Sequence, residues 1–210
     1  LHHPTKEQVD ILSKWSNEEL DLDLEAEKKY RFLALSYRKK NYVGIYTDGR
    51  HDIKGMSAKK SNTPAFISRA FNEVVEILKN ISNLEDFKRE KKNIIGIIRS
   101  YVKRIGKPID KNGFPIEDYA VTTRLSKAPS SYDDKGKPQF AKAAEWIERH
   151  TKKKFVAGDY ITYVKTKDAT GVKPISKDLK PELLPKIAEI NITKYEENLQ
   201  KVFEQLLDAL

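Results

Sequence analysis

The chain has 210 residues, of which 39% are hydrophobic and 34% are charged, and it carries a formal net charge of +9. This composition excludes a disordered tail and indicates a globular protein with one core or two small ones. No apolar run approaches the length of a membrane span, no signal peptide is visible and cysteine is absent, so we expect a cytoplasmic protein with no membrane partner, no disulfide and no thiolate metal site.

The first predicted elements are a helix and a strand. Thr5 and Gln8 form a capping box, and the apolar residues that follow recur on one face, which predicts a helix that ends near Leu20. Residues 21–27 then alternate acidic with apolar side chains. A period of two predicts a strand with one carboxylate face.

A β-hairpin is the next predicted feature. Aromatic and β-branched runs predict strands over residues 29–37 and 41–47, and a returning strand over residues 51–55. The dipeptide Asp48-Gly49 lies between the last two strands. It favours a type I′ turn, because that turn needs two residues that tolerate positive φ.

The rest of the chain is predicted to be mainly helical. Thr63 is expected to cap a helix that has Pro64 at its first position. A second capping box, from Ser82 to Glu85, predicts another helix, which Pro108 closes. The remaining predicted elements are a strand over residues 119–123, a helix over 140–150, a strand over 160–164, a loop over 166–189 and a helix over 194–210. We therefore expect an α+β fold, with a small antiparallel sheet and helices followed by a mainly helical part.

Positive charge is concentrated in two blocks of the sequence. Residues 36–69 carry eight basic and two acidic side chains, and residues 121–154 carry nine and four. Residues 6–30 are acidic by contrast, with four basic and eight acidic side chains. Two separate basic blocks suit the two walls of a groove around a nucleic-acid duplex. The alternative is a solvated surface whose lysines serve solubility.

One cluster of acidic residues is suited to Mg²⁺. Residues two apart on a strand point the same way, and carboxylate oxygens are the ligands that hard cations prefer. The cluster consists of Asp21, Asp23, Glu25 and Glu27. A solvated strand face is the alternative interpretation. Glu27-Lys28-Lys29 with Asp10 upstream also resembles, weakly, the acid and lysine set of some metal-dependent nucleases.

The predicted hairpin carries the most informative basic residues. Lys40 and Tyr42 are two apart on a predicted strand, so we expect them to share a face and to offer a phosphate or a base edge a charge beside an aromatic ring. Three further lysines come just before residues 61–64, an amide-rich helix opening that suits anions. They are Lys54, Lys59 and Lys60.

In order and spacing, these motifs resemble the end of the palm and the thumb of family B DNA polymerases, archaeal ones above all. The palm-like motifs are Leu22-Asp23-Leu24-Glu25, Lys39-Lys40-Asn41-Tyr42, Asp48-Gly49, Asp52-Ile53-Lys54-Gly55 and Lys59-Lys60-Ser61-Asn62-Thr63-Pro64. The thumb-like motifs are Thr123-Arg124-Leu125-Ser126-Lys127, Tyr132, Pro138 and Gly158-Asp159-Tyr160-Ile161-Thr162-Tyr163-Val164. The joint occurrence of the two double-lysine motifs makes the resemblance specific.

The resemblance implies that residues 1–80 are the C-terminal part of the palm and residues 81–210 the thumb of a DNA-directed DNA polymerase. It implies that the chain grips primer–template DNA, with Lys40 and Tyr42 steadying the primer strand. The residues that it places at DNA are Lys39, Lys40, Tyr42, Lys54, Lys59, Lys60, Asn62, Arg124, Lys127 and Tyr132. It also gives Glu25 and Glu27 an auxiliary metal role.

The sequence departs from the family pattern in one respect. The family's two metal-binding aspartates lie in earlier motifs, one of them Asp-Thr-Asp, that this sequence does not contain. We therefore expect Mg²⁺ to be bound mainly by an N-terminal polymerase portion or a large subunit, and this chain alone to bind DNA without extending it. A sliding clamp is a further expected partner. The alternatives that stay open are an autonomous duplex-DNA-binding module without a catalytic partner and a metal-dependent nuclease.

Overall fold

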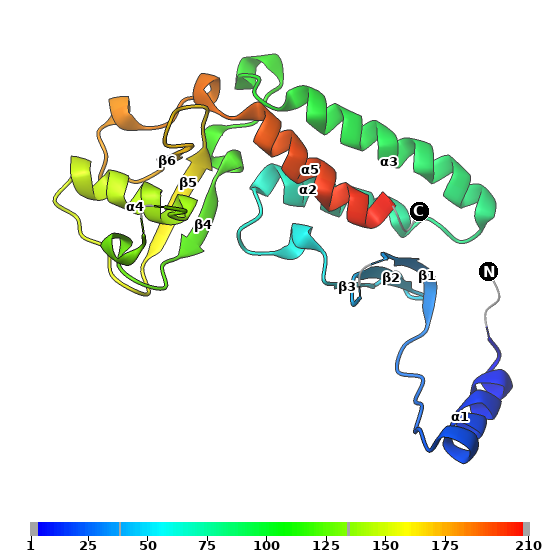
Figure 1. The fold of residues 1–210 in the computed structure, drawn as a ribbon. Helices are drawn as coiled ribbons and strands as arrows, with labels where there is room; N and C mark the ends of the chain where they lie inside the picture. Colours follow the sequence, from blue (N-terminus) through cyan, green and yellow to red (C-terminus); the bar gives the residue numbers. More distant parts are fainter. Residues whose placement is uncertain (1–3, 38, 134, 208–210) are drawn as a thin grey trace.

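The computed structural model describes residues 4–37, 39–133 and 135–207, and they form two small sheets and a set of helices (Figure 1). The helices are α1 (Lys6–Leu20), α2 (Ala65–Leu78), α3 (Leu84–Arg104), α4 (Gln139–His150) and α5 (Ile192–Leu207). The strands are β1 (Tyr30–Leu35), β2 (Tyr42–Tyr46), β3 (His51–Lys54), β4 (Val121–Arg124), β5 (Tyr160–Lys165) and β6 (Val172–Pro174). The predicted α+β class is confirmed. Residues 208–210 of the last predicted helix lie outside the described residues.

Helix α1 forms as predicted, but the strand expected after it is wrong. The amide of Gln8 donates to Thr5 Oγ1 at 3.2 Å, and the amide of Thr5 donates to Gln8 Oε1 at 2.9 Å. Residues 21–27 are exposed and have no strand structure. Ser13 and Ser16 of α1 donate their hydroxyls to backbone carbonyls of this segment at 2.9 and 3.0 Å. Alternation alone does not make a strand, because a strand also needs a neighbour for its backbone hydrogen bonds. In Figure 1, α1 and this segment project from the rest of the chain.

The first sheet has the order β1-β2-β3 and is antiparallel. The predicted type I′ turn between β2 and β3 is wrong. The amide of Gly49 donates to the Tyr46 carbonyl at 3.1 Å, and the amide of Tyr46 donates to the Arg50 carbonyl at 2.8 Å. Gly49 has φ 84°, whereas Asp48 is not among the residues with positive φ. The hairpin therefore has a three-residue loop in which glycine alone takes the left-handed conformation.

Two predicted helix caps are displaced. Helix α2 has Pro64 as its N-cap and no side-chain cap, because the Thr63 hydroxyl donates instead to the Ser57 carbonyl at 2.7 Å. Helix α3 is capped by Asn83, whose side chain accepts from the Asp86 amide at 2.9 Å, and not by Ser82. The apolar periodicity located both helices correctly. Capping depends on the path of the preceding loop, which periodicity does not report.

The second sheet has the order β4-β5-β6, and α4 packs on it. Strand β6 falls in the segment that was predicted to be a loop. It has three residues, and it pairs Pro174 with Tyr163 and Val172 with Lys165. So short a strand, ending in proline, has no detectable period. The second sheet thus has one strand more than the sequence predicts.

The buried apolar residues form two clusters. The first combines the inner face of the first sheet with α2, α3 and α5, and its members include Val43, Phe66 and Tyr195. The second lies between the second sheet and α4 and includes Leu125 and Ile147. The first cluster joins residues from both sides of residue 80, and the division into palm and thumb at that point stays a prediction. No helix in the described ranges combines the length and the apolarity that a bilayer crossing needs.

Gly44 of β2 is the position where the first sheet admits no side chain. A Cβ atom there would overlap the ring of Tyr30, which lies over the strand, and Gly44 is buried. We expect Gly44→Ala to lower the free energy of unfolding by about 1–3 kcal/mol, since Tyr30 would have to leave its place. Chemical denaturation measures this.

The matched control is Gly96→Ala in α3, where a Cβ would meet nothing within 4 Å. There the change should be neutral or stabilising by about 1 kcal/mol, because alanine is the better helix former. Equal effects of the two substitutions would contradict the role given to the Tyr30 ring.

Candidate nucleic-acid interface

The hairpin register places Tyr42 opposite Lys54 at the open end of the first sheet. Gly55, with φ 69°, follows directly and packs so closely on the Lys40 carbonyl and the Asn41 side chain that no Cβ fits. Lys40 itself has φ 58° and lies in the turn between β1 and β2. The predicted strand alternation of Lys40 with Tyr42 is therefore wrong. A tight turn, and not a shared strand face, brings these residues together.

A carboxylate fixes the hydroxyl of Tyr42. Oδ2 of Asp52 accepts from Lys28 Nζ at 2.7 Å, from the Tyr30 hydroxyl at 2.6 Å and from the Tyr42 hydroxyl at 3.0 Å. These donors, Lys28 foremost, lower the pKa of Asp52 to about 2. Burial, together with the hydrogen bond to Asp52, raises the pKa of Tyr30. Tyr42 is thus held in one orientation at the start of the central strand, β2.

The sequence analysis missed Asp52, Lys28 and Tyr30 as parts of this site. One signal was available in the hairpin itself. Asp52 and Lys54 are two apart on β3, and Lys54 pairs with Tyr42, so the register puts Asp52 diagonally beside the tyrosine. Lys28 and Tyr30 could not be found in this way, because they come from outside the hairpin.

The segment between β3 and α2 carries Lys59, Lys60 and Asn62, and the structure separates them. Lys59 Nζ donates to Asn72 Oδ1 of α2 at 3.1 Å. Lys60 and Asn62 line a cavity that this segment forms with residues of β5 and α5. The segment therefore adjoins the first sheet at Gly55 and the end of the second sheet at Lys165. In Figure 1 it runs between the two sheets.

At the far end of the second sheet, Arg124, Lys127 and Tyr132 lie close together. Arg124 Nε donates to the Gly158 carbonyl at 3.3 Å. Lys127 Nζ lies 4.5 Å from the centroid of the Tyr132 ring, and the Tyr132 hydroxyl is 2.8 Å from the Ser126 hydroxyl. Lys127 and Tyr132 are thus in contact at this end of the second sheet, where Arg124 and Lys127 are exposed and Tyr132 is half-buried.

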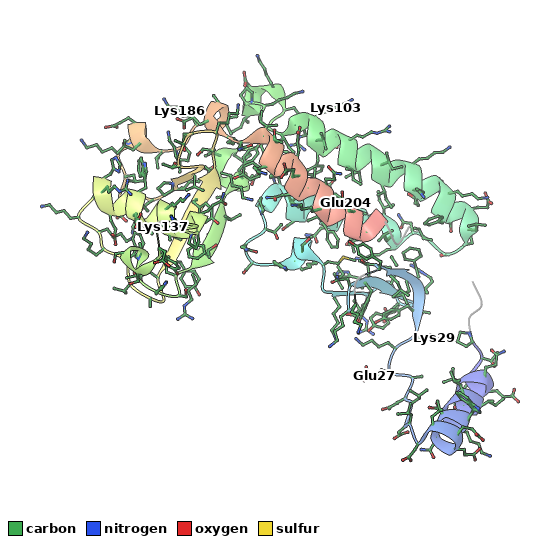
Figure 2. All side chains as sticks on the ribbon, viewed as in Figure 1. Glu27, Lys29, Lys103, Lys137, Lys186 and Glu204 are labelled. Atoms are coloured by element: carbon green, nitrogen blue, oxygen red, sulfur yellow. The ribbon has the colours of Figure 1, made fainter. Side chains whose placement is uncertain are left out.

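Glu25 and Glu27 do not form the predicted carboxylate row. Both are exposed on the segment between α1 and β1, where Figure 2 labels Glu27. The predicted strand, one of the two reasons for a metal role, is wrong, whereas the auxiliary role that the resemblance gives Glu25 and Glu27 stays a prediction. Within the described ranges, no group of three or more histidine or acidic side chains is placed to hold a metal ion. The residues described here do not fit a resident Mg²⁺ site.

The sequence matches the model of DNA polymerase family B over residues 10–210. The chain therefore belongs to this family, and the resemblance seen in its motifs is confirmed. It is 39% identical to DNA polymerase 1 of Saccharolobus solfataricus and 40% identical to DNA polymerase 1 of Sulfolobus acidocaldarius, in each case over 100% of this chain and 22% of the relative. The chain thus spans about 22% of the length of these archaeal relatives.

A solved structure agrees with this assignment. The family B DNA polymerase of the hyperthermophilic archaeon Pyrobaculum calidifontis matches with a TM-score of 0.64 at 20% identity. The match covers 98% of this chain and 24% of the other. At this level of identity the likeness extends to the fold.

The carboxylate of Asp52 should make the stability of the chain depend on pH. Its pKa in the folded chain is about 2, below the ordinary value of 3.8. Its contribution to stability is therefore complete above about pH 4 and disappears as the pH falls towards 2. We expect Asp52→Asn to lower the melting temperature near pH 6, and the difference from the unaltered chain to shrink at acid pH.

Thermal unfolding of both chains between about pH 2 and pH 7 measures this. Asp110→Asn is the control, because Asp110 is exposed and lies outside the cluster. A difference that stays constant with pH would contradict the assignment.

Proposed function

We propose that this chain is the part of an archaeal family B DNA polymerase that grips primer–template duplex, with residues 1–80 completing the palm and residues 81–210 forming the thumb. The observation that carries the proposal is that, within a family B chain, the segment with Lys60 and Asn62 connects the first sheet to the end of the second sheet at Lys165. Residues 40–55, 59–62 and the second sheet each adjoin the next, although the first and last are far apart in the sequence.

Phosphate contacts give this arrangement its chemistry. Exposed lysines and arginines replace the counterions of a duplex, which supplies affinity that does not depend on base sequence. Lys39, Lys40 and Lys54 stand at the first sheet, Lys60 and Asn62 on the connecting segment, and Arg124 and Lys127 at the second sheet. Such contacts set the register of the protein on the duplex, which a template-copying enzyme needs.

Tyr42 has a more specific proposed role at the primer end. Because Asp52 holds its hydroxyl, the ring keeps its orientation without help from DNA. A fixed ring at the open end of the sheet is suited to pack against a sugar of the primer strand. Positioning of this kind contributes to the reaction rate more than to affinity.

The remaining polymerase is the proposed partner. Apolar side chains of α1 and of the edge strand β1 are exposed, among them Ile11 at 62%, Leu12 at 54%, Trp15 at 50% and Leu35 at 60%. Apolar groups exposed together on two neighbouring elements suit contact with another protein surface. We propose that the rest of the polymerase covers them and holds the divalent metal that phosphoryl transfer needs. The sliding clamp stays an expectation from family membership.

The test combines this chain with a polypeptide that carries the rest of the polymerase, including the Asp-Thr-Asp motif. We expect the chain alone to bind a primer–template duplex without extending it, and the mixture to extend the primer. Duplex binding without extension in the mixture would instead favour an autonomous duplex-binding module. Metal-dependent cutting of DNA by the chain alone would favour the nuclease.

Tyr42→Ala should impair extension by the reconstituted enzyme about 10-fold or more while it changes duplex affinity less than about 3-fold. The reason is that no phosphate contact is lost, whereas the primer end is misplaced. Steady-state extension and fluorescence anisotropy measure the two quantities. Leu84→Ala, at an exposed apolar residue of α3, is the control for loss of an apolar side chain. Equal losses of extension and affinity would contradict the positioning role.

The two ends of the proposed interface can be tested by salt dependence. Lys54→Ala and Arg124→Ala should each reduce the slope of log affinity against log salt by about one contact. Lys103→Ala is the control, because Figure 2 shows this lysine on α3, away from both sheets. An unchanged slope in either test variant would remove that end from the interface.

A further inference from the structure

A cationic cavity lies where three segments distant in the sequence meet. Its volume is about 280 Å³, and it is bordered by the segment that precedes α2, by the end of β5 and by α5. Each of these contributes one lysine, namely Lys60, Lys165 and Lys201. Asn62 and Asn198 add side-chain amides, and no carboxylate lines the cavity. Lys165, Asn198 and Lys201 were not singled out by the sequence, because their neighbours are set by long-range packing.

The three ammonium groups have no directly bonded acidic partner in the described part of the chain, although Glu197 attracts Lys165 and Lys201 electrostatically. No hydrogen bond or ion pair among the described residues uses Nζ of Lys60, Lys165 or Lys201. Glu197 is the carboxylate that acts electrostatically on Lys165, but its ion pair, at 2.9 Å, is with Lys194. Two other half-buried lysines of the described ranges, Lys137 and Lys173, each pair with a glutamate. The cavity therefore offers a ligand three lysines that have no directly bonded carboxylate.

Lys165 is the lysine of this group whose charged form is destabilised by its surroundings. It is half-buried, and burial, followed by repulsion from Lys194 and Lys201, lowers its pKa. Like charges gathered in a partly desolvated site destabilise one another, and an anion between them reverses the sign of the interaction. An anion bound beside Lys165 would therefore favour the charged form of this lysine.

The backbone around Lys165 is held rigidly. Its amide donates to the Tyr195 hydroxyl at 2.8 Å, and its carbonyl accepts from the Asn191 amide at 3.1 Å. The hydroxyl of Tyr195, which is fully buried, donates in turn to the Tyr119 carbonyl at 2.8 Å. The backbone of Lys165 is therefore fixed before any ligand binds, which reduces the entropy cost of binding.

We propose that this cavity is a binding site for one phosphate group, which Lys60, Lys165 and Lys201 hold together with the amides of Asn62 and Asn198. Under the proposed function, on which this part of the inference rests, the phosphate belongs to the backbone of the bound duplex. The opening turn of α2, next to Pro64, adds a favourable dipole at the same cavity. A phosphate bound in the cavity would link the segment between β3 and α2 to β5 and α5.

The test uses Lys165→Met and Lys201→Met, which remove the charge and keep an unbranched chain, with Lys103→Met as the control on α3. Each test variant should lower duplex affinity and reduce the salt slope by about one contact, and the control should do neither. If Lys165→Met fails to fold, Lys201→Met still decides, because Lys201 is exposed.

A second arm titrates the unaltered chain with inorganic phosphate, at constant ionic strength set with chloride, while NMR follows the ammonium of Lys165. Phosphate should raise the pKa of Lys165 and the melting temperature, and should do so much less in Lys201→Met. An unaltered salt slope in both test variants, with duplex binding intact, would overturn the inference and leave the proposed function standing.

If the unaltered chain does not bind duplex at all, the proposed function is wrong. The titration with inorganic phosphate then tests the cavity independently of DNA. A raised pKa of Lys165 would then assign the cavity to free phosphate. The absence of any response to phosphate would overturn the inference as well.

Discussion

The packing of aromatic rings around Phe66 is the interaction on which the arrangement of the molecule depends. The Phe66 ring lies 4.9 Å from that of Phe114 and 5.2 Å from that of Tyr119, and Tyr119 lies 5.0 Å from Tyr195. These rings come from α2, from the segment before β4 and from α5. Rings at these separations contribute beyond the apolar area that they bury. They fix α2 and α5 relative to the strand that ends in Lys165, and so they determine which cations lie side by side.

The charged side chains of this protein are paired in some regions and unpaired in another. Over much of the surface, acidic and basic side chains pair locally, and such exposed pairs contribute little to stability. Around the segment between β3 and α2, lysines are left without acidic partners. The contrast explains why the net charge is large and why it gathers in blocks. Lys28 thus bonds Asp52, whereas Lys60 lines the cavity that we propose to bind phosphate.

Most elements could be predicted from the sequence because they are long enough to show their period of apolar residues. Helix α2 shows its full apolar stripe, and the Asp48-Gly49 dipeptide located the hairpin even though its loop is of another type. The predicted strand over residues 21–27 failed because alternation does not supply a neighbouring strand. Strand β6 was missed because three residues show no period. The motifs located Tyr42 and Lys54, whereas Asp52 required the register and Lys165 required the tertiary fold.

The last helix has a consequence for the order in which the chain folds. α5 comes at the end of the described residues, yet its Tyr195, Leu199 and Phe203 complete the cluster that contains Phe66. During synthesis the apolar face of α2 therefore stays uncovered until α5, more than a hundred residues later in the chain, has been made. Contacts of such high sequence separation form slowly and leave apolar surface open to aggregation in the meantime. The partly synthesised chain, with the apolar face of α2 exposed, is therefore the state to which molecular chaperones would bind best.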